Sequence, residues 1–79
     1  MDRRVRKTQR QLKEALVELM QEKDFRKITV TELTKKADIN RGTFYLHYFD
    51  VYDLLEEMEN ESLEYIKKII EKNSNPVDY

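Results

Sequence analysis

Residues 38–48 read Asp-Ile-Asn-Arg-Gly-Thr-Phe-Tyr-Leu-His-Tyr, and the predicted fold follows from this stretch. Its first three residues suit a tight turn, in which Ile39 is the buried apolar plug and Asn40 caps the next helix. We predict a helix over 41–47 after the turn and a short helix over about 30–37 before it. Two helices joined in this way form a helix-turn-helix motif.

The sequence before the motif also has helical periodicity. Residues 4–22 carry one apolar stripe, made of Leu12, Ala15, Leu16, Leu19 and Met20. Thr29-Val30-Thr31-Glu32 is a capping-box pattern, which predicts the start of the second helix. The inward residues of that helix are predicted to be Val30, Leu33 and Ala37.

A fourth helix is predicted after the motif, with Asp50 as its N-cap and an end near Lys72. One face of its first half carries Val51, Leu54, Leu55 and Met58. Its second half carries more apolar surface than the short helices upstream can cover: Leu63, Tyr65, Ile66, Ile69 and Ile70. Such a patch indicates a contact surface for a missing partner, either another copy of the chain or a further domain.

The fold class predicted from these elements is all-α. We expect a homeodomain-like three-helix domain with a helix-turn-helix motif over residues 1–50. A long linker helix over 51–73 and a flexible tail over 74–79 complete the predicted chain.

Composition argues against several functional classes. The 79 residues include no cysteine and one histidine, so a disulfide, a thiolate nucleophile and a structural zinc site are not expected. No pair of acid and base side chains suggests catalysis, and we expect neither an enzyme nor a cofactor. No apolar run reaches the roughly 18–20 residues that cross a bilayer, which predicts a cytoplasmic protein without a membrane partner.

The net charge of −1 conceals a strong asymmetry. Residues 1–49 carry twelve basic and seven acidic side chains, whereas residues 50–79 carry three basic and nine acidic ones. A basic half is typical of a surface that meets a polyanion. Solvated helix faces explain the same charges about as well.

Residues 28–55, and most specifically the run 40–48, resemble the DNA-binding domain of the TetR family of bacterial transcriptional regulators. The resemblance covers about residues 8–58. It implies a sequence-specific regulator, with a repressor favoured, and helix 41–47 in the major groove of double-stranded DNA. Family members are more than twice as long, so the resemblance also implies an absent C-terminal domain, through which a homodimer forms and a small-molecule inducer binds.

The first residues of helix 41–47 are candidates for contact with DNA. Arg41 can donate its guanidinium to guanine O6 and N7, or to a phosphate. We predict that Gly42 leaves room for a close approach of the DNA backbone; a glycine merely tolerated near a helix start is the alternative.

The rest of the helix divides between DNA and the core. We assign the hydroxyls of Thr43 and Tyr45 to phosphates, Leu46 to a thymine methyl group, and His47 to a phosphate. The competing interpretations are that Thr43 bonds back to its own helix, that Tyr45 covers an edge of the core, and that Leu46 and His47 are surface side chains without a ligand. Phe44 and Tyr48 are assigned to the core.

Two further sets of residues are candidate DNA contacts. Arg3, Arg4 and Arg6 belong to a basic arm at the start of the first helix, which the resemblance places near the DNA backbone. Thr29 and Thr31 can present hydroxyls or amides to a phosphate at the start of the second helix. A solubilising tail and simple helix capping are the respective alternatives.

The sequence departs from the family pattern at four positions. Asp24 and Asp38 occupy turn positions that are usually glycine, and both are predicted to adopt positive φ. Thr34 replaces a common alanine and needs a backbone carbonyl for its hydroxyl. Val51 replaces a lysine that meets a phosphate, and with Phe49 it predicts an unusually apolar surface.

A second function is compatible with the sequence. The apolar half of the fourth helix could make the chain a protein-interaction module that does not bind DNA. The net negative charge and Val51 favour this alternative.

Overall fold

The structure of the chain is a computed structural model that describes residues 3–73. The predicted flexible tail, 74–79, lies outside the described residues, as do the side chains of Tyr65, Ile66 and Ile69 in the predicted apolar patch.

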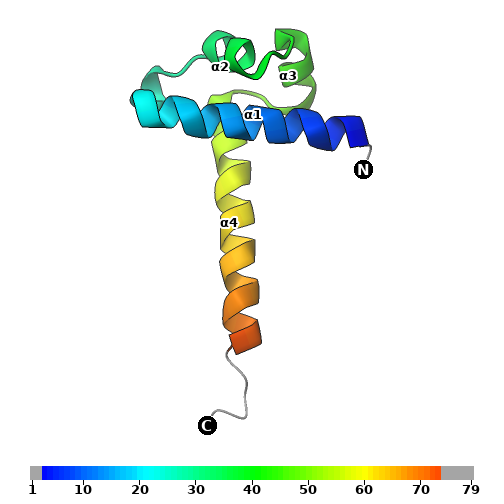
Figure 1. The fold of residues 1–79 in the computed structure, drawn as a ribbon, viewed down its shortest axis with the longest axis vertical. Coiled ribbons are helices and arrows are strands. Elements are labelled where there is room, and N and C mark those ends of the chain that lie inside the picture. Colours follow the sequence, from blue (N-terminus) through cyan, green and yellow to red (C-terminus); the bar gives the residue numbers. More distant parts are fainter. Residues whose placement is uncertain (1–2, 74–79) are drawn as a thin grey trace.

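Four α-helices make up the fold over residues 3–73, and the all-α prediction is confirmed. They are α1 (Arg3–Glu22), α2 (Val30–Ala37), α3 (Arg41–His47) and α4 (Val51–Asn73), with a short 3-10 turn, η1 (Phe25–Lys27), between α1 and α2. Figure 1 shows α2 and α3 together on one side of α1, while α4 crosses α1 and extends away on the opposite side.

Each of the four helices contributes to one small core. Its five fully buried large side chains are Leu12, Leu16, Leu33, Phe44 and Leu54. Ala15, Leu19, Ile28, Ala37, Tyr48 and Val51 complete the buried set, and Val30, Ile39, Leu55 and Met58 pack half-buried against it. The prediction for Ile39 was therefore too strong, since this side chain is only partly buried.

Met20 is an exception to the predicted stripe of α1, because its side chain is exposed. Eight helical residues turn through about 80° beyond two full turns, so Met20 lies at the edge of the stripe that Leu12 begins. It borders a groove between α1 and α4 instead of entering the core.

The predicted capping box of α2 is confirmed. The Thr29 hydroxyl accepts the N–H of Glu32 at 3.1 Å, and the Glu32 carboxylate accepts the N–H of Thr29 at 3.4 Å. Lys23 from the end of α1 pairs with the same carboxylate, and its hydrogen bond lowers the pKa of Glu32. Thr34 is buried, and its hydroxyl donates to the carbonyl of Val30 at 2.8 Å as expected.

The two turn aspartates behave differently. Asp38 ends α2 with φ 58° and ψ 46°, the predicted left-handed conformation. The prediction for Asp24 is wrong, because its φ of −60° and ψ of 131° are extended. Asp24 is the N-cap of η1, where its carboxylate accepts the N–H of Arg26 at 2.9 Å and pairs with the Arg26 guanidinium. A new helical turn needs an extended cap, so no positive φ is required there.

Two aspartates close the start of α4. Asp50 accepts the N–H of Asp53 at 2.9 Å, which confirms its capping role, and Asp53 in turn accepts the N–H of Phe49 at 2.8 Å. Val51 and Leu54 are buried, whereas every side chain that the structure describes beyond Met58 is exposed. The apolar contacts of the long helix with the domain therefore lie in its first two turns.

Candidate nucleic-acid interface

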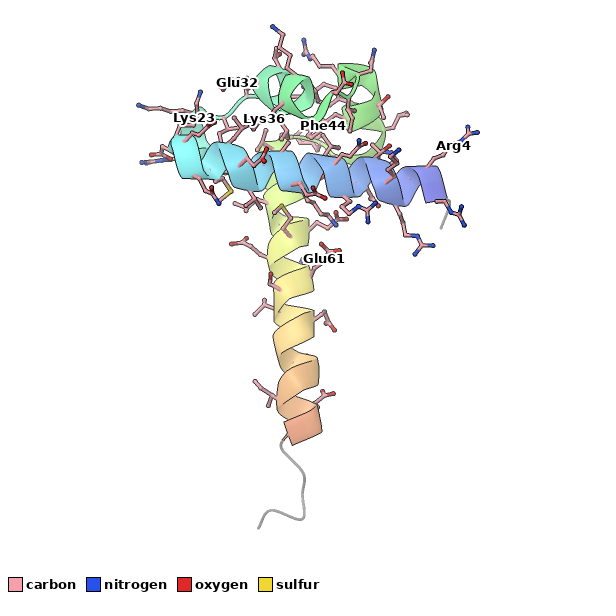
Figure 2. All side chains as sticks on the ribbon, viewed as in Figure 1. Arg4, Lys23, Glu32, Lys36, Phe44 and Glu61 are labelled. Carbon is pink, nitrogen blue, oxygen red and sulfur yellow. The ribbon has the colours of Figure 1, made fainter. Side chains whose placement is uncertain are left out.

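The core holds α3 by one face and leaves the opposite face open. Asn40 caps the helix by accepting the N–H of Gly42 at 2.7 Å, and buried Phe44 fixes it from within. Figure 2 shows Phe44 on the side of α3 that faces α1. Arg41, Tyr45 and Leu46 are exposed, with Leu46 at 79%. The prediction that Phe44 belongs to the core is confirmed, and the open face is available to a ligand.

Tyr45 and Arg41 are organised by aromatic contacts one turn apart. The Tyr45 ring meets the edge of Phe44 with 5.3 Å between centroids, so the core positions a half-exposed ring. The Arg41 guanidinium carbon lies 5.9 Å from the centroid of the Tyr45 ring. Stacking of this kind restrains the guanidinium while its donors stay open to a base or a phosphate.

Thr43 and His47 lie at the sides of α3, because both are half-buried. Tyr48 follows as the C-cap residue and is buried, as predicted. The five side chains assigned to DNA on this helix therefore divide into three exposed ones, Arg41, Tyr45 and Leu46, and two half-buried ones, Thr43 and His47.

Gly42 has a local explanation that the sequence did not reveal. A Cβ built on this residue would lie 3.0 Å from Oδ1 of Asn40, the atom that caps the helix. Contacts this close are rare, so the cap itself favours glycine here. Access for a DNA backbone is an additional reason that nothing in this geometry requires.

A shallow groove between α2 and α3 brings further polar groups to Arg41. It is lined by Thr31, Thr34, Lys35, Asp38, Ile39, Asn40 and Arg41. Thr31 therefore shares a surface with the start of α3, whereas the Thr29 hydroxyl is engaged in its cap. Sequence reasoning missed Lys35, although it lies four residues after Thr31 and so shares an exposed side of α2 with it.

The basic arm divides between two sides of α1. Figure 2 shows Arg4 projecting from the end of α1 on the side where α3 lies. Arg3 and Arg6 line a groove between α1 and α4 instead, together with Lys7, Gln9, Arg10, Lys13, Glu57 and Glu61. Arg3 and Arg6 therefore share a groove with Glu57 and Glu61.

The start of α4 is closed to anions. Helix N-termini attract phosphate because their first N–H groups are unpaired. Here the Asp50 carboxylate accepts one of these groups, the N–H of Asp53, and the Asp53 carboxylate accepts the N–H of Phe49 just before the helix, so that two negative charges lie at this end. Val51 is only 6% exposed, so it packs in the core and contributes no surface. The predicted apolar surface is provided by Phe49, at 83% exposure, and by Tyr52, whose ring packs edge-on against Phe25 at 4.9 Å.

Residues 3–73 contain no group of three or more histidine or acidic side chains that could hold a metal ion. None of the helices over the same residues is long and apolar enough to span a membrane.

A helix-turn-helix motif whose second helix, here α3, has an open and partly basic face defines a class of DNA-binding regulator domains, which are not enzymes. The model of the family described as bacterial regulatory proteins, tetR family, matches residues 12–58. That match covers more than half of the chain, and the protein belongs to this family.

A curated relative supports the assignment. The chain is 35% identical over 60 residues to YxbF of Bacillus subtilis (strain 168), which is described as an uncharacterized HTH-type transcriptional regulator. The aligned part covers 76% of this chain and 16% of the length of the relative. No solved structure gave a significant match.

Proposed function

We propose that this chain binds double-stranded DNA in a sequence-specific manner, with α3 in the major groove, as the reading domain of a transcriptional repressor. The observation that carries the proposal is the open face of α3, where Arg41, Tyr45 and Leu46 are exposed on a helix held by Phe44. A helix of this kind fits the groove, and its N-terminal residues can reach base edges.

Within this proposal the side chains have distinct roles. Arg41 reads a guanine or grips a phosphate, Leu46 meets a thymine methyl group, and Tyr45 donates its hydroxyl to a phosphate. Thr43 and His47 contact the phosphates that flank α3, since both are lateral and half-buried. Gly42 permits the close approach of the DNA backbone.

The outer contacts of the proposed interface come from α1 and α2. Thr31 lies in the groove beside Arg41, and we add Lys35 as a phosphate contact. Arg4 is the strongest candidate in the basic arm because of its direction. Arg3 and Arg6 contribute through longer-range electrostatic attraction to the DNA phosphates. Thr29 offers at most a backbone group to a phosphate, because its hydroxyl caps α2.

The complete regulator is proposed to act as a homodimer whose two reading helices meet half-sites one helical turn apart. A small-molecule inducer would act through a domain beyond the described residues. Action on chromosomal DNA would place the protein in the cytoplasm.

Fluorescence anisotropy with a labelled nonspecific duplex at about 50 and 200 mM salt tests the proposal. We expect binding at the lower concentration and a steep loss at the higher one, because contacts to phosphates release counterions. Arg41→Ala should weaken binding, whereas Lys67→Ala, which removes one positive charge from the exposed far half of α4, should not. Selection of bound oligonucleotides would then give the preferred sequence.

A second candidate function rests on the exposed apolar side chains of α4. Leu63 and Ile70 are 62% and 57% exposed, which suits a protein-interaction module without DNA binding. Sedimentation of the chain and of Leu63→Gln tests it. Self-association that Leu63→Gln abolishes, together with no duplex binding at low salt, would favour this function over the first.

A further inference from the structure

One carboxylate lies where three helices meet. The Tyr48 hydroxyl, at the end of α3, donates to Oε2 of Glu57 on α4 at 2.6 Å. The ammonium of Lys13 on α1 lies 3.2 Å from the same oxygen. The Glu57 side chain on α4 therefore contacts both the end of α3, the proposed reading helix, and α1.

The contact to Tyr48 is held rigidly from the side of α3. Tyr48 is 5% exposed, its ring packs on Phe44 with 5.5 Å between centroids, and its N–H donates to the Phe44 carbonyl at 3.0 Å. Burial and the neighbouring Glu57 both raise the pKa of Tyr48, so its hydroxyl stays protonated and remains a donor. A movement of Glu57 therefore acts directly on Tyr48, the C-cap residue of α3.

Lys13 extends the junction along α4. Its ammonium also donates to Oε1 of Glu61 at 2.7 Å, and its side chain is only 22% exposed. Figure 2 shows Glu61 on α4 just beyond α1. The two glutamates are one helical turn apart, so Lys13 spans successive turns of α4 on one side.

The apolar contacts of α4 cannot define its direction by themselves. Val51 and Leu54 are buried and Leu55 and Met58 are half-buried, but the rest of the helix extends away from the domain (Figure 1). Hydrophobic contact is non-directional, whereas charge-assisted hydrogen bonds hold a defined geometry. The hydrogen bonds to Glu57 and Glu61 add directional contacts to this packing.

We propose that Glu57 is a positioning residue that fixes the direction of α4 relative to the reading helix through the Tyr48 hydroxyl and the Lys13 ammonium. The proposal deepens the proposed function, on which its meaning for DNA rests. Glu57 thereby couples α4 to the helix that the proposed function places in the DNA groove.

Spin labels test this arrangement without DNA. The chain has no cysteine, so Gln11→Cys on α1 and Glu64→Cys on α4, both at exposed positions, give two unique labelling sites. Pulsed electron paramagnetic resonance then reports the distribution of distances between the labels. We expect one narrow distribution for the doubly labelled chain and a broader or shifted one after Glu57→Ala.

Two further variants make the outcome decisive. Tyr48→Phe keeps the buried ring and removes only the hydroxyl, so it should also broaden the distribution while the helical circular dichroism signal stays the same. Glu56→Ala removes an exposed carboxylate of the neighbouring residue and should leave the distribution unchanged. Distributions in Glu57→Ala and Tyr48→Phe that match that of Glu56→Ala would overturn the proposal.

Duplex binding by the same proteins separates this inference from the function on which it rests. Broadened distances in a chain that never binds duplex would contradict the proposed function and support the positioning role. Duplex binding with unchanged distances would contradict the positioning role alone.

Discussion

Oδ1 of Asn40 accepts the N–H of Gly42 at 2.7 Å, and a Cβ on Gly42 would lie 3.0 Å from that same oxygen. The cap of the reading helix and its only glycine therefore depend on each other. The cap is thus a reason for glycine at position 42 within the fold, and it can be tested separately from a close approach of the DNA backbone.

Gly42→Ala should raise the free energy of unfolding by less than the roughly 0.5–1 kcal/mol that such a change usually contributes in a helix. The new methyl group forces the Asn40 cap to shift, which offsets the gain. Thermal unfolding of Gly42→Ala measured in the Asn40→Ala background is the matched comparison, and there the full gain should return. An equal gain in both backgrounds would contradict the cap explanation.

If the DNA backbone also approaches Gly42, the same substitution should weaken duplex binding several-fold although the fold is intact. Anisotropy titration of folded Gly42→Ala measures this second effect independently of stability.

Substitutions of Thr29 separate its capping role from a contact with phosphate. Thr29→Ala should destabilise the domain by about 1 kcal/mol, because the N–H of Glu32 loses its acceptor. Thr29→Asp preserves the cap and should leave stability nearly unchanged, but it adds a negative charge where a phosphate would lie. Denaturant unfolding and duplex titration of both variants provide the two readouts. Unaltered affinity in Thr29→Asp would remove Thr29 from the interface.

Because Arg4 and Arg6 lie on different sides of α1, we expect their replacement by alanine to affect duplex binding differently. Arg4→Ala should reduce affinity for every duplex and lower the slope of log affinity against log salt by about one, as expected for one lost phosphate contact. Arg6→Ala should change the slope by less, because Arg6 lines the groove beside Glu57 and Glu61. Equal slopes for both variants would show that their directions do not matter.

Alkaline pH should destabilise the domain through the junction of Tyr48 and Lys13. The folded state raises the pKa of both groups above their ordinary values of 10.0 and 10.5. For Lys13, hydrogen bonds to Glu61 and Glu57 outweigh the opposing effect of burial. The folded chain binds these protons more tightly than the unfolded chain, so stability is retained below about pH 10 and falls as the pH rises further.

Chemical denaturation between pH 8 and 11.5 measures this dependence. Tyr48→Phe removes one of the two titrating groups and should flatten the decline above pH 10. A decline as steep as that of the unsubstituted chain would assign alkaline unfolding to other groups.

Much of the fold could be predicted because helix starts are local. A cap joins a side chain to a backbone N–H two or three residues away, so Thr29, Asn40 and Asp50 were recognisable from the sequence alone. The left-handed Asp38 was predicted instead from the family pattern, which usually has glycine at this turn position. The family run at 40–48 then indicated the open face of α3, although the contacts of its side chains with DNA remain predictions.

What sequence periodicity could not decide depends on neighbours that are distant along the chain. Met20 was expected on the buried stripe of α1 but is exposed, and Val51 was expected to add to an apolar surface but is buried. The basic arm looked uniform in sequence, but the two sides of α1 face different helices. Lys13, Tyr48 and Glu57 had no common motif, and only the crossing of α1 and α4 brings them together.

The sequence by itself thus determined where the helices begin and end and which of them presents its outer face, because hydrogen bonding and periodicity act over a few residues. The tertiary structure alone decided the direction of α4 and the sides to which the arginines point. These features depend on contacts between different helices, such as that of Lys13 with Glu61, which are 48 positions apart and so share no local pattern.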